Sequence, residues 1–72
     1  MISDHRKEYQ KIAKKLIGAR LARGLKQGKA ATLIDKSQSY ISKVETGKIF
    51  IGAVELAMLA KAYKKPIDYF LQ

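Results

Sequence analysis

Polar side chains suited to recognising another molecule are concentrated in residues 37–48, SQSYISKVETGK. Ile41 and Val44 are spaced as on the buried side of a helix over about 38–46, so the other side chains of that helix are expected to face outward. Amide, hydroxyl and ammonium groups on such a helix can hydrogen-bond to base edges in the major groove of DNA, glutamine best to adenine and lysine to guanine. The candidate base-reading residues are Gln38, Ser39, Ser42 and Lys43.

Catalytic chemistry has little support in the same sequence. Cysteine is absent, His5 is the only histidine, and the six acidic residues lack the spacing of paired catalytic carboxylates or of metal ligands. A glycine-rich phosphate loop is also missing. We therefore expect a protein that is not an enzyme, with no catalytic residue, no metal site and no cofactor.

The charge of the chain favours a polyanionic partner. Fifteen lysines and arginines against six acidic residues give a net charge of +9, which suits nucleic acid or an anionic lipid surface. Between Tyr9 and Ile34 there are seven basic residues and no acidic one. Like charges repel, so this run indicates an anion-facing surface rather than an ordinary solvated helix face.

Two other classes of anionic partner fit less well. An RNA-binding or membrane-surface domain agrees with the charge, but the tyrosines are scattered and Leu16 and Ile17 are needed for the core. No apolar run approaches the roughly 20 residues of a membrane span, and the first ten residues lack the apolar stretch of a signal peptide. We expect a cytoplasmic, nucleoid-associated protein without a membrane partner.

Apolar residues follow helical spacing almost throughout, whereas strand patterns are absent. Ser3 or Asp4 is expected to cap the first helix and Ser37 the third. Pro66 is expected in the first turn of the last helix. The expected helices cover about residues 4–23, 27–34, 38–46, 53–63 and 66–71. The sequence thus predicts one all-α domain over residues 1–72.

The central segment resembles the helix-turn-helix of the lambda-repressor and Cro-like family, also called the XRE family. The family pattern is matched without a gap at Leu25, Gln27, Ala31, Ser37, Ile41, Ser42, Glu45, Gly47 and Lys48. The similarity extends to Arg20, Leu56, Leu59, Ala60, Asp68 and Phe70. It implies a five-helix lambda-repressor-like fold with a helix-turn-helix at about 27–46. It also implies a transcriptional regulator, with repression the favoured role, that binds double-stranded DNA through helix 38–46 in the major groove.

The resemblance also assigns supporting roles. Arg20 and Glu45 are implied to form a structural salt bridge between the first helix and the recognition helix. Gln27 is implied to contact phosphate, with simple capping of its helix as the alternative, and Tyr40 is left open between the sugar-phosphate backbone and a thymine methyl. Residues 46–48 are implied to contact phosphate through backbone N–H groups and a basic side chain. The expected phosphate contacts are Lys26, Gln27, Lys29, Tyr40, Thr46, Gly47 and Lys48.

Residues 48–51, KIFI, depart most from the family pattern, which usually has polar residues and a proline there. Consecutive apolar residues on a loop need a cover, unless Ile49 or Ile51 simply packs into the core. We expect a homodimer, which implies an operator with two half-sites in an inverted repeat. The expected dimer interface contains Ile49, Phe50, Ile51, Tyr69, Phe70 and Leu71.

Smaller departures qualify this interpretation. Asp35 stands at the turn glycine and must tolerate the left-handed conformation, and Lys36 replaces an apolar residue and adds a charge near DNA. Leu33 and Met58 are apolar where the family is usually polar. These two residues keep an alternative open: an antitoxin-like or protein-interaction domain whose DNA binding depends on a partner protein.

Overall fold

Within residues 5–72, five helices form where the apolar spacing predicts them. The computed structural model describes residues 5–72, and it contains no β-strand within that range. Ser3 and Asp4, expected to cap the first helix, lie outside the described residues. The helices are α1 (His5–Ala22), α2 (Gln27–Leu33), α3 (Gln38–Thr46), α4 (Ala53–Ala62) and α5 (Asp68–Leu71). The expected all-α, five-helix fold class is confirmed.

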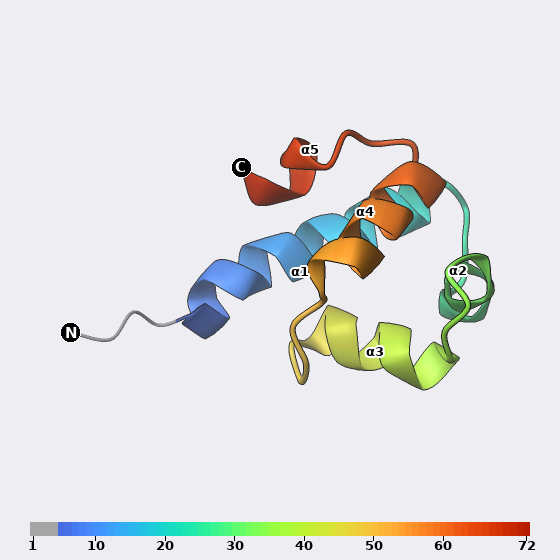
Figure 1. The fold of residues 1–72 in the computed structure, drawn as a ribbon, viewed down its shortest axis with the longest axis horizontal. Coiled ribbons are helices and arrows are strands. Elements are labelled where there is room, and N and C mark those ends of the chain that lie inside the picture. The colour runs from blue at the N-terminus through green and yellow to red at the C-terminus, as the bar shows by residue number, and fades with distance from the viewer. Residues whose placement is uncertain (1–4) are drawn as a thin grey trace.

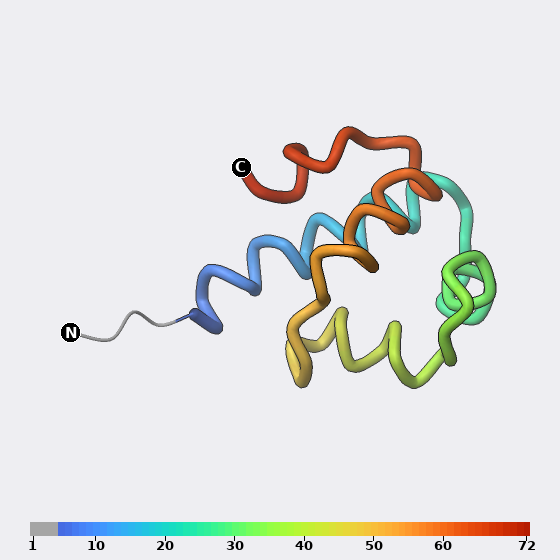
Figure 2. Tube along the Cα trace, viewed as in Figure 1, coloured from blue at the N-terminus to red at the C-terminus, as the bar shows by residue number. Residues whose placement is uncertain are grey.

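The long helix α1 lies between α5 and α3 (Figure 1). It contacts α3 on one side and α5 on the other, while α2 and α3 pack against each other more extensively than any other pair. The trace in Figure 2 shows the chain turning after α4 and running back, so that α5 and α3 lie on opposite sides of α1. This arrangement leaves the outer side of α3 uncovered.

The core takes its residues from one side of each helix. The side chains with almost no exposed surface are Leu16 of α1, Ala30 of α2, Ile41 and Val44 of α3, Leu59 of α4 and Phe70 of α5. Burial of such side chains is the main favourable contribution to the free energy of folding. A chain of this size buries a smaller fraction of its surface than a larger domain, so its stability is marginal.

The turn between α2 and α3 depends on Asp35. This residue adopts φ 58°, in the left-handed region that the sequence predicts for it. Two residues later, the backbone of Ser37 is extended. The hydroxyl oxygen of Ser37 accepts a hydrogen bond from the amide of Tyr40 at 3.1 Å. This side-chain cap begins α3 at Gln38.

Replacing Asp35 with glycine is expected to raise the free energy of unfolding by up to about 1 kcal/mol. A side chain at positive φ crowds the neighbouring carbonyl, whereas glycine adopts this conformation freely. Urea denaturation followed by circular dichroism measures the difference. Asp68→Gly, at a helical and exposed position, is the matched control and is expected to be neutral or destabilising. A loss of stability in Asp35→Gly would contradict the argument.

The last helix differs from expectation in its start. Pro66 precedes α5, which begins at Asp68, and the Pro66 carbonyl accepts a hydrogen bond from the amide of Tyr69 at 3.0 Å. The proline therefore sits in a turn before the helix, not in its first turn. Lys15 of α1 holds the other end, because its Nζ donates to the carbonyls of Tyr69 and Gln72, both at 3.1 Å. Such carbonyls at a helix end have no intrahelical partner.

Candidate nucleic-acid interface

The outer side of α3 is polar and accessible. Because Ile41 and Val44 are fully buried, the opposite side of the helix faces solvent. The four expected base-reading side chains all lie there: Gln38, Ser39 and Lys43 are exposed and Ser42 is half-buried. The structure thus brings these four side chains together on the outer side of α3, and the Ser37 cap sets where that helix begins.

A buried network joins α1 to α3 beneath this surface. Arg20 Nε donates to Glu45 Oε2 at 2.7 Å, and Arg20 Nη2 donates to Glu45 Oε1 at 3.1 Å. Each residue is only 8% exposed. The hydrogen bond to Glu45 raises the pKa of Arg20, so the guanidinium stays protonated. Arg20 Nη1 also donates to the carbonyl of Leu25 at 2.8 Å, which ties the start of the α2 segment to the same group.

Gln27 belongs to this network. Its Nε2 donates to Glu45 Oε1 at 2.9 Å, so its side chain does not cap α2. The residue at the N-cap of α2 is Lys26, which forms no side-chain cap hydrogen bond. One N–H of the Gln27 side chain is therefore used within the protein, and the phosphate contact expected of Gln27 stays a prediction.

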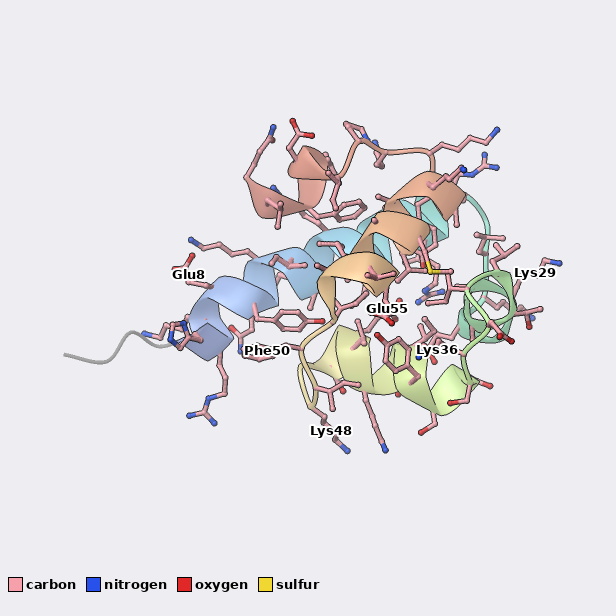
Figure 3. All side chains as sticks on the ribbon, in the orientation of Figure 1. Glu8, Lys29, Lys36, Lys48, Phe50 and Glu55 are labelled. Carbon is pink, nitrogen blue, oxygen red and sulfur yellow. The ribbon has the colours of Figure 1, made fainter. Side chains whose placement is uncertain are left out.

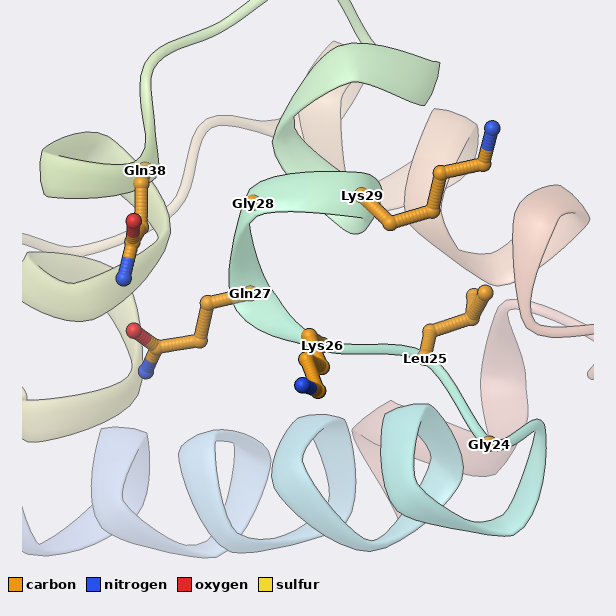
Figure 4. Close-up of a pocket in the computed structure, with 7 residues that line it drawn as sticks. All are labelled: Gly24, Leu25, Lys26, Gln27, Gly28, Lys29 and Gln38. Atoms are coloured by element: carbon orange, nitrogen blue, oxygen red, sulfur yellow. The ribbon is translucent and has the colours of Figure 1, made fainter.

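Basic and amide side chains surround the start of α2. Lys26 and Lys29 are exposed there, beside a groove that residues 24–29 and Gln38 line (Figure 4). Gln38 reaches this groove from α3, since a Cβ built on Gly28 would lie 3.9 Å from Gln38 Oε1. Gln38 thus lies on the same continuous surface as the ammonium groups of Lys26 and Lys29. Gln38 is a candidate for reading bases.

The end of α3 corrects part of the expected phosphate set. Gly47 has φ 80°, its amide donates to the Val44 carbonyl at 3.3 Å, and the Lys48 amide donates to the Lys43 carbonyl at 2.9 Å. The hydroxyl of Thr46 donates to the Ser42 carbonyl at 2.8 Å. These donors close the helix end instead of facing outward. The exposed ammonium group of Lys48 remains as the phosphate-binding candidate of this segment.

Lys14 of α1 is a candidate that the expected set lacked. It is exposed and lines a shallow groove with Thr46 and Gly47 at the end of α3. The acid-free run from Tyr9 to Ile34 contained it, but a charge run does not say which lysine faces α3. Only the packing of α1 against α3 selects it.

Tyr40 packs toward the start of α4, next to Gly52 and Glu55, and its expected phosphate contact stays a prediction. Its ring is half-buried against the core, and Lys36 Nζ lies 5.2 Å from the ring centroid. Burial raises the pKa of Tyr40, and the neighbouring charge of Glu55 adds to the rise. Lys36 also lies 3.9 Å from the Glu55 carboxylate (Figure 3). The charge that Lys36 was expected to add near DNA is thus partly balanced by Glu55.

Tyr9 fixes the apolar loop that follows α3. Its hydroxyl donates to the Val44 carbonyl at 2.9 Å and accepts from the amide of Ile51 at 3.3 Å. The ring of Phe50 stacks on the ring of Tyr9 with centroids 4.5 Å apart, and Phe50 remains 48% exposed. The loop therefore has a defined shape and presents Phe50 to solvent.

The six expected interface residues differ in exposure. Phe50 and Leu71 are 48% and 59% exposed, while Ile49, Ile51 and Tyr69 are half-buried against the core. Phe70 has no exposed surface, so its assignment to a dimer interface is wrong. The single turn of α5 must bury one side to dock on α1, and Phe70 lies on that side.

Known proteins are similar to this chain in sequence and in fold. A family model described as "Helix-turn-helix" matches residues 16–70. An uncharacterized HTH-type transcriptional regulator of Rickettsia conorii is 34% identical over 61 residues, which cover 85% of this chain and 49% of the relative. The chain therefore spans about half the length of this curated relative.

A solved structure is similar over nearly its whole length. The high-resolution crystal structure of the restriction-modification controller protein C.AhdI from Aeromonas hydrophila superimposes with a TM-score of 0.87 at 29% identity, covering 94% of this chain and 99% of that one. Within residues 5–72, none of the helices has the length and apolarity needed to cross a bilayer. The chain belongs to the helix-turn-helix family of DNA-binding transcriptional regulators, of the XRE type with a lambda-repressor-like fold.

Proposed function

We propose that this protein is a sequence-specific repressor that binds an inverted-repeat operator as a homodimer, with α3 in the major groove. The observation that carries the proposal is the exposed polar side of α3. This helix is begun by the Ser37 cap and held from beneath by the Arg20–Glu45 pair. A reading helix supported in this way keeps its side chains in one orientation toward base edges.

The contacts divide into two kinds. Base edges are read by Gln38, Ser39, Ser42 and Lys43, of which Gln38 and Lys43 discriminate most because each matches one base best. Phosphates are held by Lys26, Gln27 and Lys29 at one end and by Lys14 and Lys48 at the other. These phosphate contacts set register and give salt-dependent affinity without choosing a sequence.

An apolar groove on the side of the Phe50 loop supports the homodimer. Phe50, Ile51 and Leu71 line it together with Ile12 of α1, and Val54 is 69% exposed at the start of α4. An isologous contact through this groove would cover Phe50 and Leu71 in both copies at once. Two recognition helices about 34 Å apart would then meet successive major grooves on one side of the duplex.

Selection of bound duplexes from a random pool tests the proposal. We expect a recovered inverted repeat, and transcription in vitro from a promoter that carries it is expected to fall as protein is added. Recovery of single half-sites would contradict the dimer. Equal binding to any polyanion would contradict specific recognition.

Gln38→Ala is expected to weaken binding to the selected site by about 1–3 kcal/mol while leaving binding to random duplex unchanged.

Lys29→Gln is expected to weaken binding to the selected site and to random duplex about equally. It is also expected to lower the slope of log affinity against log salt concentration by about one. Fluorescence anisotropy at several salt concentrations measures both effects. Lys61→Gln, on the exposed side of α4, removes the same charge away from α3 and should change neither. If Gln38→Ala weakened random duplex equally, Gln38 would not read bases.

A further inference from the structure

A second groove is built by the ends of three helices. Leu33 of α2 and Met58 and Ala62 of α4 line it, and Arg23, Lys61 and Lys64 complete its wall. Its volume is about 590 Å³. In Figure 1 the C-terminal ends of α1 and α4 meet at one end of the molecule, while the loop with Phe50 lies below the start of α4. None of the groove residues belongs to the reading side of α3 or to the expected dimer interface.

The apolar part of this groove is uncovered. Leu33 is 48% exposed and Met58 is 41% exposed. Single apolar side chains scattered over a surface are normal, but two large ones lining the same hollow favour a contact with another molecule. Methionine is also well suited to such a surface, because its flexible thioether adapts to different shapes.

The wall of the groove is cationic and unpaired. None of Arg23, Lys61 and Lys64 forms a salt bridge with any of residues 5–72, and no acidic residue lines the groove. Lys64 has φ 60°, a conformation in which glycine would avoid the crowding that a side chain causes. The chain thus places a cation at this wall despite a conformational cost.

These charges select among the possible occupants. A second copy bound through the same groove would set three cations against three cations, which is unfavourable. A DNA backbone would satisfy the cations but would gain nothing from Leu33 and Met58. A protein segment with carboxylates flanking apolar side chains complements both parts of the groove.

We propose that this groove docks a short acidic, amphipathic segment of another protein. One or two apolar side chains of the segment pack between Leu33 and Met58, and its carboxylates pair with Arg23, Lys61 and Lys64. This inference does not rest on the operator or the dimer of the proposed function. Because the groove lies apart from α3 and from the Phe50 loop, the segment can bind while DNA is held.

A peptide selection tests the proposal. Displayed random peptides of about 16 residues, long enough to cross the groove as a helix or a strand, are selected on the full chain at physiological ionic strength. Each round is depleted on Leu33→Glu/Met58→Glu, which keeps the rest of the basic surface. Recovered peptides are then bound to labelled protein, and their positions are mapped from amide chemical shifts in NMR spectra.

The expected peptides combine aspartate or glutamate with leucine or aromatic residues, and they shift the amides around Leu33, Met58 and Lys61. Met58→Glu is expected to weaken their binding about tenfold, which corresponds to about 1.4 kcal/mol. Lys64→Gly removes one cation and relieves the left-handed strain, so it folds, and it is expected to weaken binding several-fold. Leu21→Glu, at a position 60% exposed and outside the groove, is the matched control and should bind as the unchanged chain does.

Several results would overturn the proposal. These are the recovery of no peptide, the recovery of peptides without acidic residues, and shifts centred on α3 or on Phe50. Binding of unchanged strength to Lys64→Gly would also remove the electrostatic part of the argument. DNA affinity of Leu33→Glu/Met58→Glu, measured separately, distinguishes failure here from failure of the DNA-binding function.

Discussion

Glu45→Ala is expected to lower the free energy of unfolding by about 3–5 kcal/mol, a large part of the stability of a small domain. The change removes the acceptor of two Arg20 hydrogen bonds and of the Gln27 hydrogen bond. Arg20 would then be a buried cation without a counter-charge. Such an isolated charge costs far more than the pair contributes.

Urea unfolding followed by far-UV circular dichroism measures this loss. Glu8→Ala is the matched control, because Glu8 pairs with Lys11 at 3.7 Å on an open surface, where such pairs contribute little. The double change Arg20→Met/Glu45→Leu is expected to recover most of the stability, since it removes both charges and keeps apolar volume. If Glu45→Ala unfolded like the unchanged chain, the network would not be the support of α3 that we infer.

The second large effect is expected from Phe50→Glu. A carboxylate at the centre of an apolar interface cannot be desolvated without a partner, so the dimer is expected to dissociate. Affinity for the full inverted repeat should then fall by about 10²-fold or more, because the linkage between two half-site contacts is lost. Affinity for a single half-site should stay the same. Sedimentation equilibrium and anisotropy with full and half operators measure the two quantities.

A second variant separates the interface from the fold. Phe50 also stacks on Tyr9, so its replacement removes an intramolecular contact as well. Leu71→Glu changes a residue that is 59% exposed and should give the same monomer without disturbing Tyr9. Leu21→Glu, equally exposed but outside the Phe50 groove, should remain dimeric. An unchanged sedimentation mass in both Phe50→Glu and Leu71→Glu would place the interface elsewhere.

The recognition helix could be predicted from the sequence because its signals are local. Ser37 at the N-cap, Gly47 in the left-handed region and the pair Ile41 and Val44 each act within one or two turns. Their agreement fixed the start, end and orientation of α3. The family and its DNA-binding function were implied by the resemblance of residues 25–48 to a known pattern, and the comparisons confirm them.

Features that depend on distant partners could not be predicted in this way. The position of Tyr40 against α4 depends on packing between segments. Phe70 illustrates the same limit, since an apolar residue near a chain end suits a core and an interface equally well until α5 is placed on α1.

The amides of Gly47 and Lys48 are a different case, because their acceptors, the carbonyls of Val44 and Lys43, are local. A glycine that ends a helix in the left-handed region commonly brings such bonds with it, so the sequence could have shown that these donors are used.

The hydroxyl of Tyr9 has a consequence for operator geometry. It bonds both to the last turn of α3 and to Ile51 in the exposed loop, so it ties α3 directly to the loop. In a dimer formed through that loop, the separation of the two reading helices is fixed by short, stiff connections. Inserting one base pair between the half-sites moves them apart by a few ångströms. It also rotates one half-site relative to the other about the duplex axis by about a tenth of a turn. Such a dimer is expected to reject operators of altered spacer length even when every contacted base is unchanged.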